Sequence, residues 1–308
     1  MALKELNEIY KLIENLKLHG EYDRRGVFEC IPYWNENFGD KGQCNGEVYC
    51  ADNLEIMRSL ARSDFKGKFQ MIYMDPPFYS GAKYFSRRSD GSKKLAYSDV
   101  WGSGLLEYLE MIANRILIAK ELLSDDGLIW IHLDYRAVHY VKIIMDEIFG
   151  MENMVNEIVW GYRSGGASGR RFARKHDTIL LYSKTKDYKF NPQKEKSYNR
   201  GAQPYHFKGV KEYEDENGWY TLVNMRDVWE IPMVGRTSGE RTGYATQKPE
   251  ELLKRIVLAS TDVGDLCGDF FAGSGTLGAV CMGLGRSFVL CDENKDACKI
   301  MADRLLKK

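Results

Sequence analysis

The chain has 308 residues, of which 44% are hydrophobic and 29% charged, with 44 basic residues against 44 acidic ones. This length fits one large α/β domain with an insertion, or two modest domains, and the composition excludes a disordered or fibrous protein. Its apolar runs fall far short of the roughly 20 residues of a membrane span, and its charged start lacks a signal-peptide core, so we expect a cytoplasmic protein without membrane contact.

Helical and strand patterns alternate through the first half of the chain. Residues 3–18 place Leu, Ile and Tyr three and four positions apart, which predicts an amphipathic helix that ends at Gly20. Asp125-Asp126-Gly127 predicts a turn before a strand. The other expected elements are strands at 47–51, 70–74 and 128–133, and helices at 53–62, 105–123 and 137–149. Such alternation predicts βαβ units around a mostly parallel sheet.

The pattern breaks in the second half of the chain and then returns. Two more strands are expected at 155–162 and 177–182, on either side of a Gly-rich basic segment. From about 184 to 245 the composition shifts to Lys, Tyr, Asn, Gly and Trp with little periodicity, which indicates an insertion outside the core. The α/β pattern resumes with helices at 248–260 and 276–285 and strands at 265–271 and 287–291.

The seven cysteines form no CxxC pair and have no histidine at zinc-site spacing. We therefore predict reduced, mostly buried thiols and no metal site. Because basic and acidic residues balance, any contact with nucleic acid must come from a local basic patch.

A glycine-rich turn near the C-terminal end indicates a nucleoside site. Gly273-Ser-Gly275-Thr-Leu-Gly278 stands between an expected strand and an expected helix, as a nucleotide-binding turn requires. Asp292 ends the next strand 19 residues after Gly273, where a carboxylate can accept both hydroxyls of a ribose. The alternative is a tight turn beside an ordinary surface aspartate. Since only about 30 residues follow the turn, a ligand with one nucleoside fits better than NAD.

A second motif, Asp75-Pro76-Pro77-Phe78, follows the expected strand at 70–74. It therefore lies at the carboxyl end of a strand, where α/β proteins bind ligands. The prolines remove two backbone donors, so the Asp75 carboxylate and the Pro76 carbonyl form a double acceptor that suits an amine with two N–H bonds. Phe78 offers a flat face for a base that has left its duplex. Taken alone, the motif is more often only a rigid turn.

Together and in this order, the two motifs resemble those of the beta group of DNA amino-methyltransferases, whose DPP[YF] motif precedes the S-adenosylmethionine motif. Further segments are similar to motifs of that family: Ala51–Leu54, Tyr97–Trp101, Gly127–Asp134, Lys175–Asp177 and Thr246–Leu253. Many relatives have Pro where Phe270 stands and Tyr where Phe78 stands. Cytosine N4 enzymes more often have Ser in place of Asp75, which favours adenine without deciding between the two bases.

The resemblance implies a role for each matching residue. Asp75, Pro76, Pro77 and Phe78 would form the catalytic corner, and Lys248 would be the counter-charge to the methionyl carboxylate. The residues expected to hold S-adenosylmethionine are Asp52, Asn53, Lys248, Pro249, Asp269, Phe271, Gly273, Ser274, Gly275, Thr276, Asp292 and Asn294. Methyl transfer would be a direct in-line displacement without a covalent enzyme intermediate.

Two basic segments are candidate clamps on DNA phosphates. One is the Gly-rich segment 163–175 and the other follows the catalytic corner, although charge runs are more often solvated faces. The residues expected to contact DNA are Lys83, Arg87, Arg88, Arg163, Arg170, Arg171, Arg174 and Lys175. The insertion has the composition of a region that reads base edges, with a capping subdomain or dimer contact as its alternative.

The resemblance as a whole implies a Rossmann-like S-adenosylmethionine-dependent methyltransferase fold, with a mostly parallel sheet, an antiparallel hairpin and circularly permuted motifs. We expect an N-terminal helical extension at 1–45, a catalytic half at 46–183, a target-recognition insertion at 184–245 and a cofactor half at 246–308. The implied activity is site-specific methylation of adenine N6 in double-stranded DNA, in the setting of restriction-modification. Alternatives are cytosine N4 of DNA, an RNA or protein amide, an NAD-dependent oxidoreductase and an inactive binding subunit. A homodimer and a restriction endonuclease partner stay open.

Overall fold

The computed structural model describes residue 11 and residues 29–34, 45–87, 93–102, 104–162, 169–201, 203–235 and 237–306. The expected helix at 3–18 therefore lies outside the described residues, apart from residue 11. Residues 29–34 of the expected helical extension form a strand that pairs with residues 45–50.

Within the described residues, nine strands form one central sheet in the order β1-β2-β14-β13-β3-β6-β8-β7-β12. The five strands from β2 to β6 in this order run parallel, and β8 is antiparallel to both β6 and β7. The strands are β1 (Glu29–Trp34), β2 (Asn45–Cys50), β3 (Phe69–Met74), β6 (Leu123–Leu133), β7 (Met154–Gly161), β8 (His176–Ser183), β12 (Val228–Glu230), β13 (Leu266–Asp269) and β14 (Ser287–Asp292). The predicted mostly parallel sheet with an antiparallel hairpin is confirmed.

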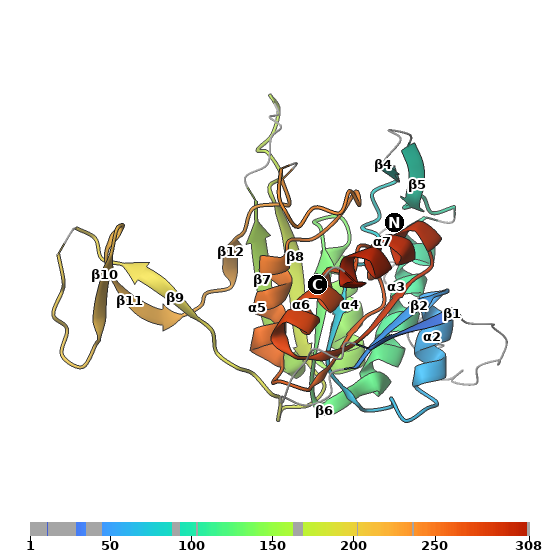
Figure 1. The fold of residues 1–308 in the computed structure, drawn as a ribbon, viewed down its shortest axis with the longest axis horizontal. Coiled ribbons are helices and arrows are strands. Elements are labelled where there is room, and N and C mark those ends of the chain that lie inside the picture. The colour runs from blue at the N-terminus through green and yellow to red at the C-terminus, as the bar shows by residue number, and fades with distance from the viewer. Residues whose placement is uncertain are drawn as a thin grey trace.

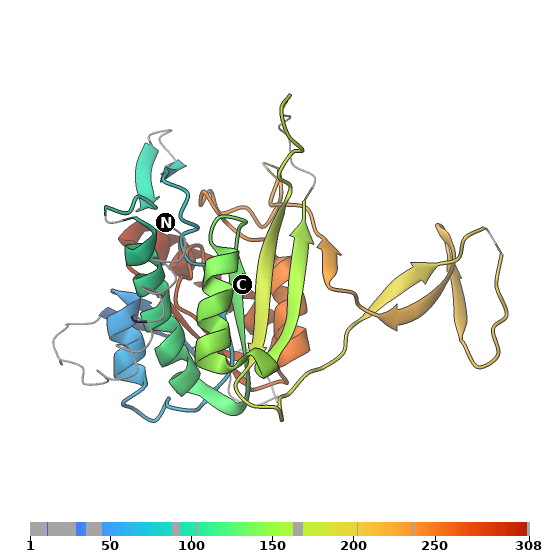
Figure 2. The same ribbon diagram turned by 180° about the vertical axis from the view of Figure 1, so that it is seen from behind.

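Helices cover both faces of this sheet, which makes the body a three-layer α/β structure (Figures 1 and 2). One face carries α2 (Asn53–Leu60), α3 (Leu105–Leu122) and α4 (Val138–Phe149). The other carries α5 (Glu250–Ser260), α6 (Thr276–Leu284) and α7 (Lys295–Leu306), and a short 3-10 helix, η1 (Met151–Asn153), follows α4. Among the described residues, no helix is both long enough and apolar enough to cross a membrane.

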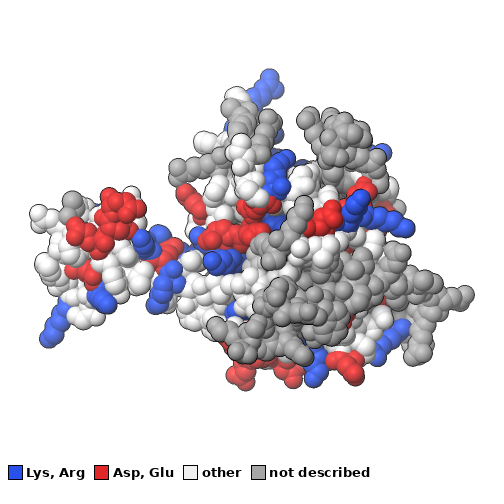
Figure 3. All heavy atoms as spheres, viewed as in Figure 1, with Lys and Arg blue, Asp and Glu red and all other residues white. Residues whose placement is uncertain are grey.

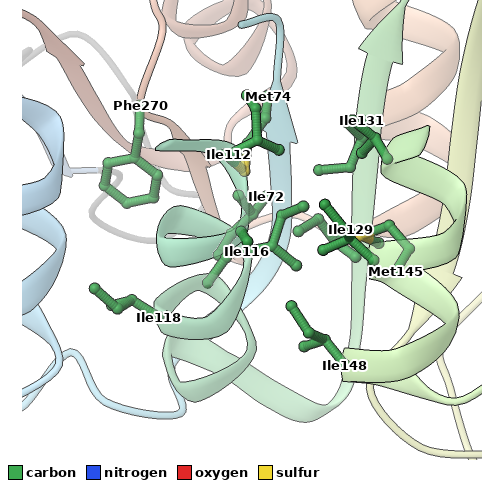
Figure 4. Packing of buried hydrophobic residues seen from close by; sticks show 14 of the residues in the cluster. Ile72, Met74, Ile112, Ile116, Ile118, Ile129, Ile131, Met145, Ile148 and Phe270 are labelled. Carbon is green, nitrogen blue, oxygen red and sulfur yellow. The ribbon is translucent and has the colours of Figure 1, made fainter. Parts of the chain in front are cut away.

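The core fills the space between the sheet and its helices. All six residues of β3 are buried, because helices cover both faces of a parallel sheet. On one face, Ile72 and Ile129 of the sheet pack with Ile112 of α3 and Met145 of α4 (Figure 4). Phe270, where many relatives have Pro, is fully buried in the same cluster. The strands that lead to the candidate site are therefore held on both sides.

The segment 184–245 differs from the irregular insertion that we expected. It contains β9 (Lys194–Tyr198), β10 (Glu212–Asp215) and β11 (Gly218–Asn224), which form an antiparallel sheet that projects sideways from the body as an arm (Figures 1 and 2). The same segment contributes β12 to the central sheet, where Trp229 and Ile231 are buried. The expectation that none of this segment belongs to the core was therefore wrong for its last part.

Smaller differences lie near the turns. The expected turn at Asp125–Gly127 lies inside β6. The pairing of β6 with β3 is shifted between Phe69 and Met71, because β6 has more residues than β3 between the two paired positions. The basic segment after the catalytic corner forms a hairpin of β4 (Lys83–Arg87) and β5 (Lys93–Ser98). Helix α7 was not expected from the sequence. The five cysteines with described side chains are free, and four of them are buried.

Candidate active site

Strand order places the two motifs side by side. β13 pairs in parallel with β3, with Asp269 opposite Tyr73. The chain that leaves β3 at Asp75 and the chain that leaves β13 toward Gly273 therefore emerge at the same edge of the sheet. β14, which ends at Asp292, and β2, which leads to Asp52, are the next two strands in order.

A cavity of about 320 Å³ opens where these strand ends meet. A smaller adjoining recess shares Asp75, Tyr244, Thr246 and Lys248 with it, so the two motifs line neighbouring spaces. The expected site residues that line the cavity are Asn53, Asp75, Pro76, Pro77, Phe78, Lys248, Phe271, Asp292 and Asn294, and those that line the recess include Asp269, Gly273, Ser274 and Thr276.

Three expected residues line neither the cavity nor the recess and instead stand at the N-terminal ends of helices. Asp52 caps α2, where its side chain accepts from the Glu55 amide, Pro249 precedes α5, and Gly275 precedes α6. Each of them therefore stands at the start of a helix.

The carboxylate of Asp75 has two different sides. Its Oδ2 accepts a hydrogen bond from the Lys248 ammonium, which also lies 5.4 Å from the centre of the Phe78 ring. Its Oδ1 is buried without a hydrogen-bond partner among the described residues and lies 3.9 Å from His132 Nδ1. The ammonium therefore occupies the cavity side of the carboxylate, between Asp75 and the ring of Phe78. The resemblance assigned Lys248 to the methionyl carboxylate, whereas in this structure its partner is Asp75.

A buried polar chain supports Asp75 and Phe78 from behind. His132, fully buried, shares a 2.7 Å hydrogen bond with the Tyr73 hydroxyl and lies 3.3 Å from Asp177. Burial opposes ionisation of Asp177, but the hydrogen bond and charge of His132 outweigh it and hold the Asp177 pKa below its ordinary value. The His132 ring lies 5.7 Å from the Phe78 ring. Sequence reasoning assigned no role to His132, because a lone histidine in a strand carries no motif.

The glycine turn is built around positive φ angles. Gly273 and Gly275 have φ of +51° and +70°, which only glycine adopts readily. A Cβ on Gly275 would lie 2.4 Å from Met301 Cγ, so this position also has no room for a side chain. The hydroxyls of Ser274 and Thr276 are held by Arg304 Nη1, at 3.3 and 2.9 Å. This arginine on α7 was missed by sequence reasoning, since the helix itself was missed.

Asp292 joins the turn to the cavity. Its carboxylate accepts the Gly273 amide at 2.9 Å and the Asn294 amide at 2.9 Å. Burial raises its pKa to about 6 despite these two hydrogen bonds. Burial also raises the pKa of Asp269, which accepts the Phe271 amide at 3.0 Å. Both carboxyls therefore lie in surroundings that disfavour their charged form.

A buried arginine of α3 forms one wall of the cavity. Arg115 Nε donates to Asn53 Oδ1 at 2.6 Å, and its guanidinium lies 5.9 Å from the centre of the Phe271 ring. Asn53 in turn donates to the Phe270 carbonyl at 2.6 Å, which ties α2 to the chain after β13. Burial lowers the pKa of Arg115. The only sequence signal for this residue was a cation on the apolar face of an amphipathic helix.

Two projections stand on the edge of the sheet that carries the cavity (Figures 1 and 2). One is the β4–β5 hairpin and the other is the loop between β7 and β8, whose end carries basic side chains in Figure 3. Arg170, Arg171 and Arg174 on this loop and Lys83 on the hairpin are exposed, and Lys175 is partly buried. Arg88 and Arg163 lie outside the described residues, as does the side chain of Arg87.

Known proteins resemble this chain in sequence and in fold. A family described as DNA methylase matches residues 69–303. The Type II methyltransferase M2.DpnII of Streptococcus pneumoniae is 29% identical and covers 93% of this chain and 97% of its own length. The Type II methyltransferase M.HpaI of Haemophilus parainfluenzae is 28% identical, over 84% of this chain and 73% of its own length.

Solved structures share the fold at low sequence identity. The M1.HpyAVI–SAM complex matches with a TM-score of 0.55 and 21% identity, over 84% of this chain and 98% of its own. The cytosine-N4-specific PvuII DNA methyltransferase matches with a TM-score of 0.59 and 18% identity, over 87% of this chain and 90% of its own.

These findings confirm the predicted fold class and the predicted S-adenosylmethionine-dependent DNA methyltransferase. They give no support to the nicotinamide oxidoreductase or to the RNA or protein amide methyltransferase that the sequence had left open. Because the family match spans most of the chain, this protein belongs to the N6/N4 DNA methylase family.

Proposed function

We propose that this protein is a site-specific DNA methyltransferase that transfers the methyl group of S-adenosylmethionine to N6 of adenine. The observation that carries the proposal is the shared cavity, which is lined by Asp75 and Phe78 together with Phe271 and Asp292, while the glycine turn lines the adjoining recess. A base and a methyl donor can meet only if their two sites open to one space.

The acceptor pair suits an exocyclic amine. Asp75 Oδ2 faces the cavity, and Pro76, which also lines it, offers a carbonyl without a competing amide donor of its own. When the amine donates both hydrogens to these oxygens, its nitrogen lone pair is turned away from the ring and becomes nucleophilic. Phe78 stacks on the extruded base and holds its plane.

The residues on the opposite wall fit the methyl donor. Asp292 would accept the ribose hydroxyls, Phe271 and Asn53 would flank the adenine, and the Gly273 turn allows the backbone to approach closely. S-adenosylmethionine, when bound, supplies a methyl group on a positively charged sulfur. The chain itself orients the acceptor amine and excludes water. Lys248 would exchange Asp75 for the methionyl carboxylate when the cofactor binds.

Adenine is favoured over cytosine because Asp75 occupies the position that is more often Ser in cytosine N4 enzymes. Cytosine N4 is the second candidate, since the same pair of acceptors suits its amine equally well. The relatives named Type II methyltransferases support a restriction-modification setting. We expect the protein to work in the cytoplasm, with its DNA.

Incubation of the purified protein with tritiated S-adenosylmethionine and unmethylated genomic DNA tests this function. Enzymatic digestion followed by chromatography of the nucleosides should recover the label as N6-methyldeoxyadenosine. Label in N4-methyldeoxycytidine would establish the second candidate. No label in DNA, from protein that binds S-adenosylhomocysteine, would contradict both.

A further inference from the structure

We infer that Asp99 is a positioning residue that holds the catalytic corner in its working shape. This inference rests on the proposed function, because it concerns how Phe78 is presented to the target base. Asp99 follows β5 and is fully buried, although it touches neither the cavity nor the recess. It belongs to the segment Tyr97–Trp101, which the sequence singled out but to which it assigned no role.

The hydrogen bonds of Asp99 converge on the residues just after the two prolines. Its Oδ2 accepts the amides of Phe78 and Ser80 at 3.1 and 2.6 Å and the Ser80 hydroxyl at 2.6 Å. Its Oδ1 accepts the Tyr79 amide at 3.1 Å and the Trp101 indole N–H at 2.8 Å. One carboxylate thus accepts hydrogen bonds from three consecutive backbone amides, those of residues 78–80.

The backbone of Asp99 closes the same loop. Its amide donates to the Ala82 carbonyl at 2.9 Å, and its carbonyl accepts the Gly81 amide at 3.0 Å. Within this loop, Tyr79 adopts a φ of +58°. A tyrosine is rarely found in this left-handed region, so the surrounding hydrogen bonds must hold it there.

The consequence reaches the chemistry through Phe78. The amide of Phe78 is fixed by Asp99, its ring lies 5.7 Å from the His132 ring, and the Lys248 ammonium lies 5.4 Å from its centre. Only a carboxylate can accept from all five donors, since an amide presents hydrogens of its own to at least two of them. Loss of these bonds would shift the stacking face relative to Asp75.

The variant Asp99→Asn tests the inference, with Asp146→Asn as the matched control. Asp146 lies on α4, away from the cavity, and accepts from the Tyr182 hydroxyl at 2.5 Å and from Lys142 at 2.6 Å. With tritiated S-adenosylmethionine and unmethylated genomic DNA, we expect Asp99→Asn to lower kcat about 100-fold, as small misplacements of a reacting group do. Affinity for S-adenosylhomocysteine should stay within about twofold, and Asp146→Asn should keep the wild-type kcat.

Hydrogen exchange measures directly how well the amides of residues 78–80 are protected, and it does not need an active enzyme. The amides of residues 78–80 should exchange about tenfold faster or more in Asp99→Asn, and not in Asp146→Asn. A normal kcat in folded Asp99→Asn, or unchanged exchange at these amides, would overturn the inference. If Asp99→Asn does not fold, Ser80→Ala decides, because it removes one of the five donors to Asp99 while the carboxylate stays. Faster exchange at the amides of residues 78 and 79 together with a reduced kcat supports the role, and a wild-type kcat contradicts it. A wild-type protein that labels no DNA would instead count against the proposed function.

Discussion

In the proposed mechanism, the target amine and Lys248 would compete for the same oxygen of Asp75. The two side chains are largely buried, with 15% of Asp75 and 12% of Lys248 exposed. Breaking a buried ion pair by removing one partner costs stability, because the other charge is left unpaired. The family resemblance gave the methionyl carboxylate as the partner of Lys248. The contact with Asp75 could not be predicted from the sequence, because residues 75 and 248 are far apart along the chain.

The variant Lys248→Met should therefore lower the free energy of unfolding by about 3 kcal/mol. The double variant Asp75→Asn with Lys248→Met should recover most of that loss, because it no longer buries an unpaired carboxylate. Urea unfolding followed by circular dichroism measures both. Equal losses in the single and double variants would show that Asp75 does not depend on Lys248.

The raised pKa of Asp292, about 6, predicts a pH dependence of cofactor binding. Below pH 6 the carboxyl is increasingly protonated and becomes a poorer acceptor for ribose hydroxyls. The dissociation constant of S-adenosylhomocysteine should rise as pH falls from 7 to 5, by up to about tenfold per unit below pH 6. Calorimetric titration measures it, and in Asp292→Asn this dependence should disappear. A flat profile in the wild-type protein would exclude Asp292 as the ribose acceptor.

The raised pKa of Asp292 affects folding in the opposite direction from cofactor binding. A carboxyl with a pKa above its ordinary value of 3.8 favours the folded state at low pH. Its contribution to the free energy of unfolding is therefore lost as pH rises from about 4 to 6. Asp292 thus works against stability under the conditions in which it would bind the cofactor.

At the level of elements, the helix that follows the glycine turn depends on Gly275. Its φ is +70°, and an added Cβ would lie 2.4 Å from Met301 Cγ on α7. Gly283 on the same helix has no neighbour within 4 Å of an added Cβ, which makes it a matched control.

We expect Gly275→Ala to lower the free energy of unfolding by about 1–3 kcal/mol, through strain and overpacking against α7. Gly283→Ala should raise it by about 0.5–1 kcal/mol, since alanine is the better helix former. Thermal and urea unfolding of the two variants measure the difference. Equal effects would mean that the turn tolerates a side chain and that its glycine serves no structural need.

The elements that the sequence predicted are those with a strong apolar pattern. β3 is buried on both faces and is apolar apart from Gln70, and α3 and α4 bury residues three and four apart. The arm strands were missed because all their side chains are partly or fully exposed, so no strand has a buried apolar face. β12 was missed because a strand of three residues is too short for any periodicity.

The candidate site followed the same division. Asp75, Gly273 and Asp292 stand in local motifs, so the sequence could name them before their positions were known. Arg115 contacts residues distant in the chain and lies in no motif, and the segment Tyr97–Trp101, although it was singled out, does not reveal the contacts of Asp99 with the residues after Pro77.

Viewed as a whole molecule, the protein has two projections on the edge of the sheet that carries the cavity and its arm at one side (Figures 1 and 2). We therefore propose that the loop that carries Arg170, Arg171 and Arg174 contacts phosphates next to an extruded base. The arm shows both basic and acidic side chains in Figure 3, so we expect it to contribute to site choice more than to charge attraction.

Replacing these three arginines by alanine should weaken DNA binding and its dependence on salt. The slope of log affinity against log salt should fall by about 0.9 for each phosphate contact that is lost. Fluorescence anisotropy with a labelled duplex at several salt concentrations measures the slope. The control changes Lys66 and Lys68, which are exposed before the amino end of β3, at the opposite edge of the sheet. The same slope in both variants would remove this loop from the DNA interface.

Single-molecule sequencing of DNA from a host that expresses the protein tests most directly whether Asp75 directs methyl transfer to adenine. We expect N6-methyladenine at one recurring sequence with the wild-type protein, and none with Asp75→Ala, although that variant should still bind S-adenosylhomocysteine. Unmodified DNA with the wild-type protein, or the same methylation with Asp75→Ala, would contradict the role assigned to the shared cavity.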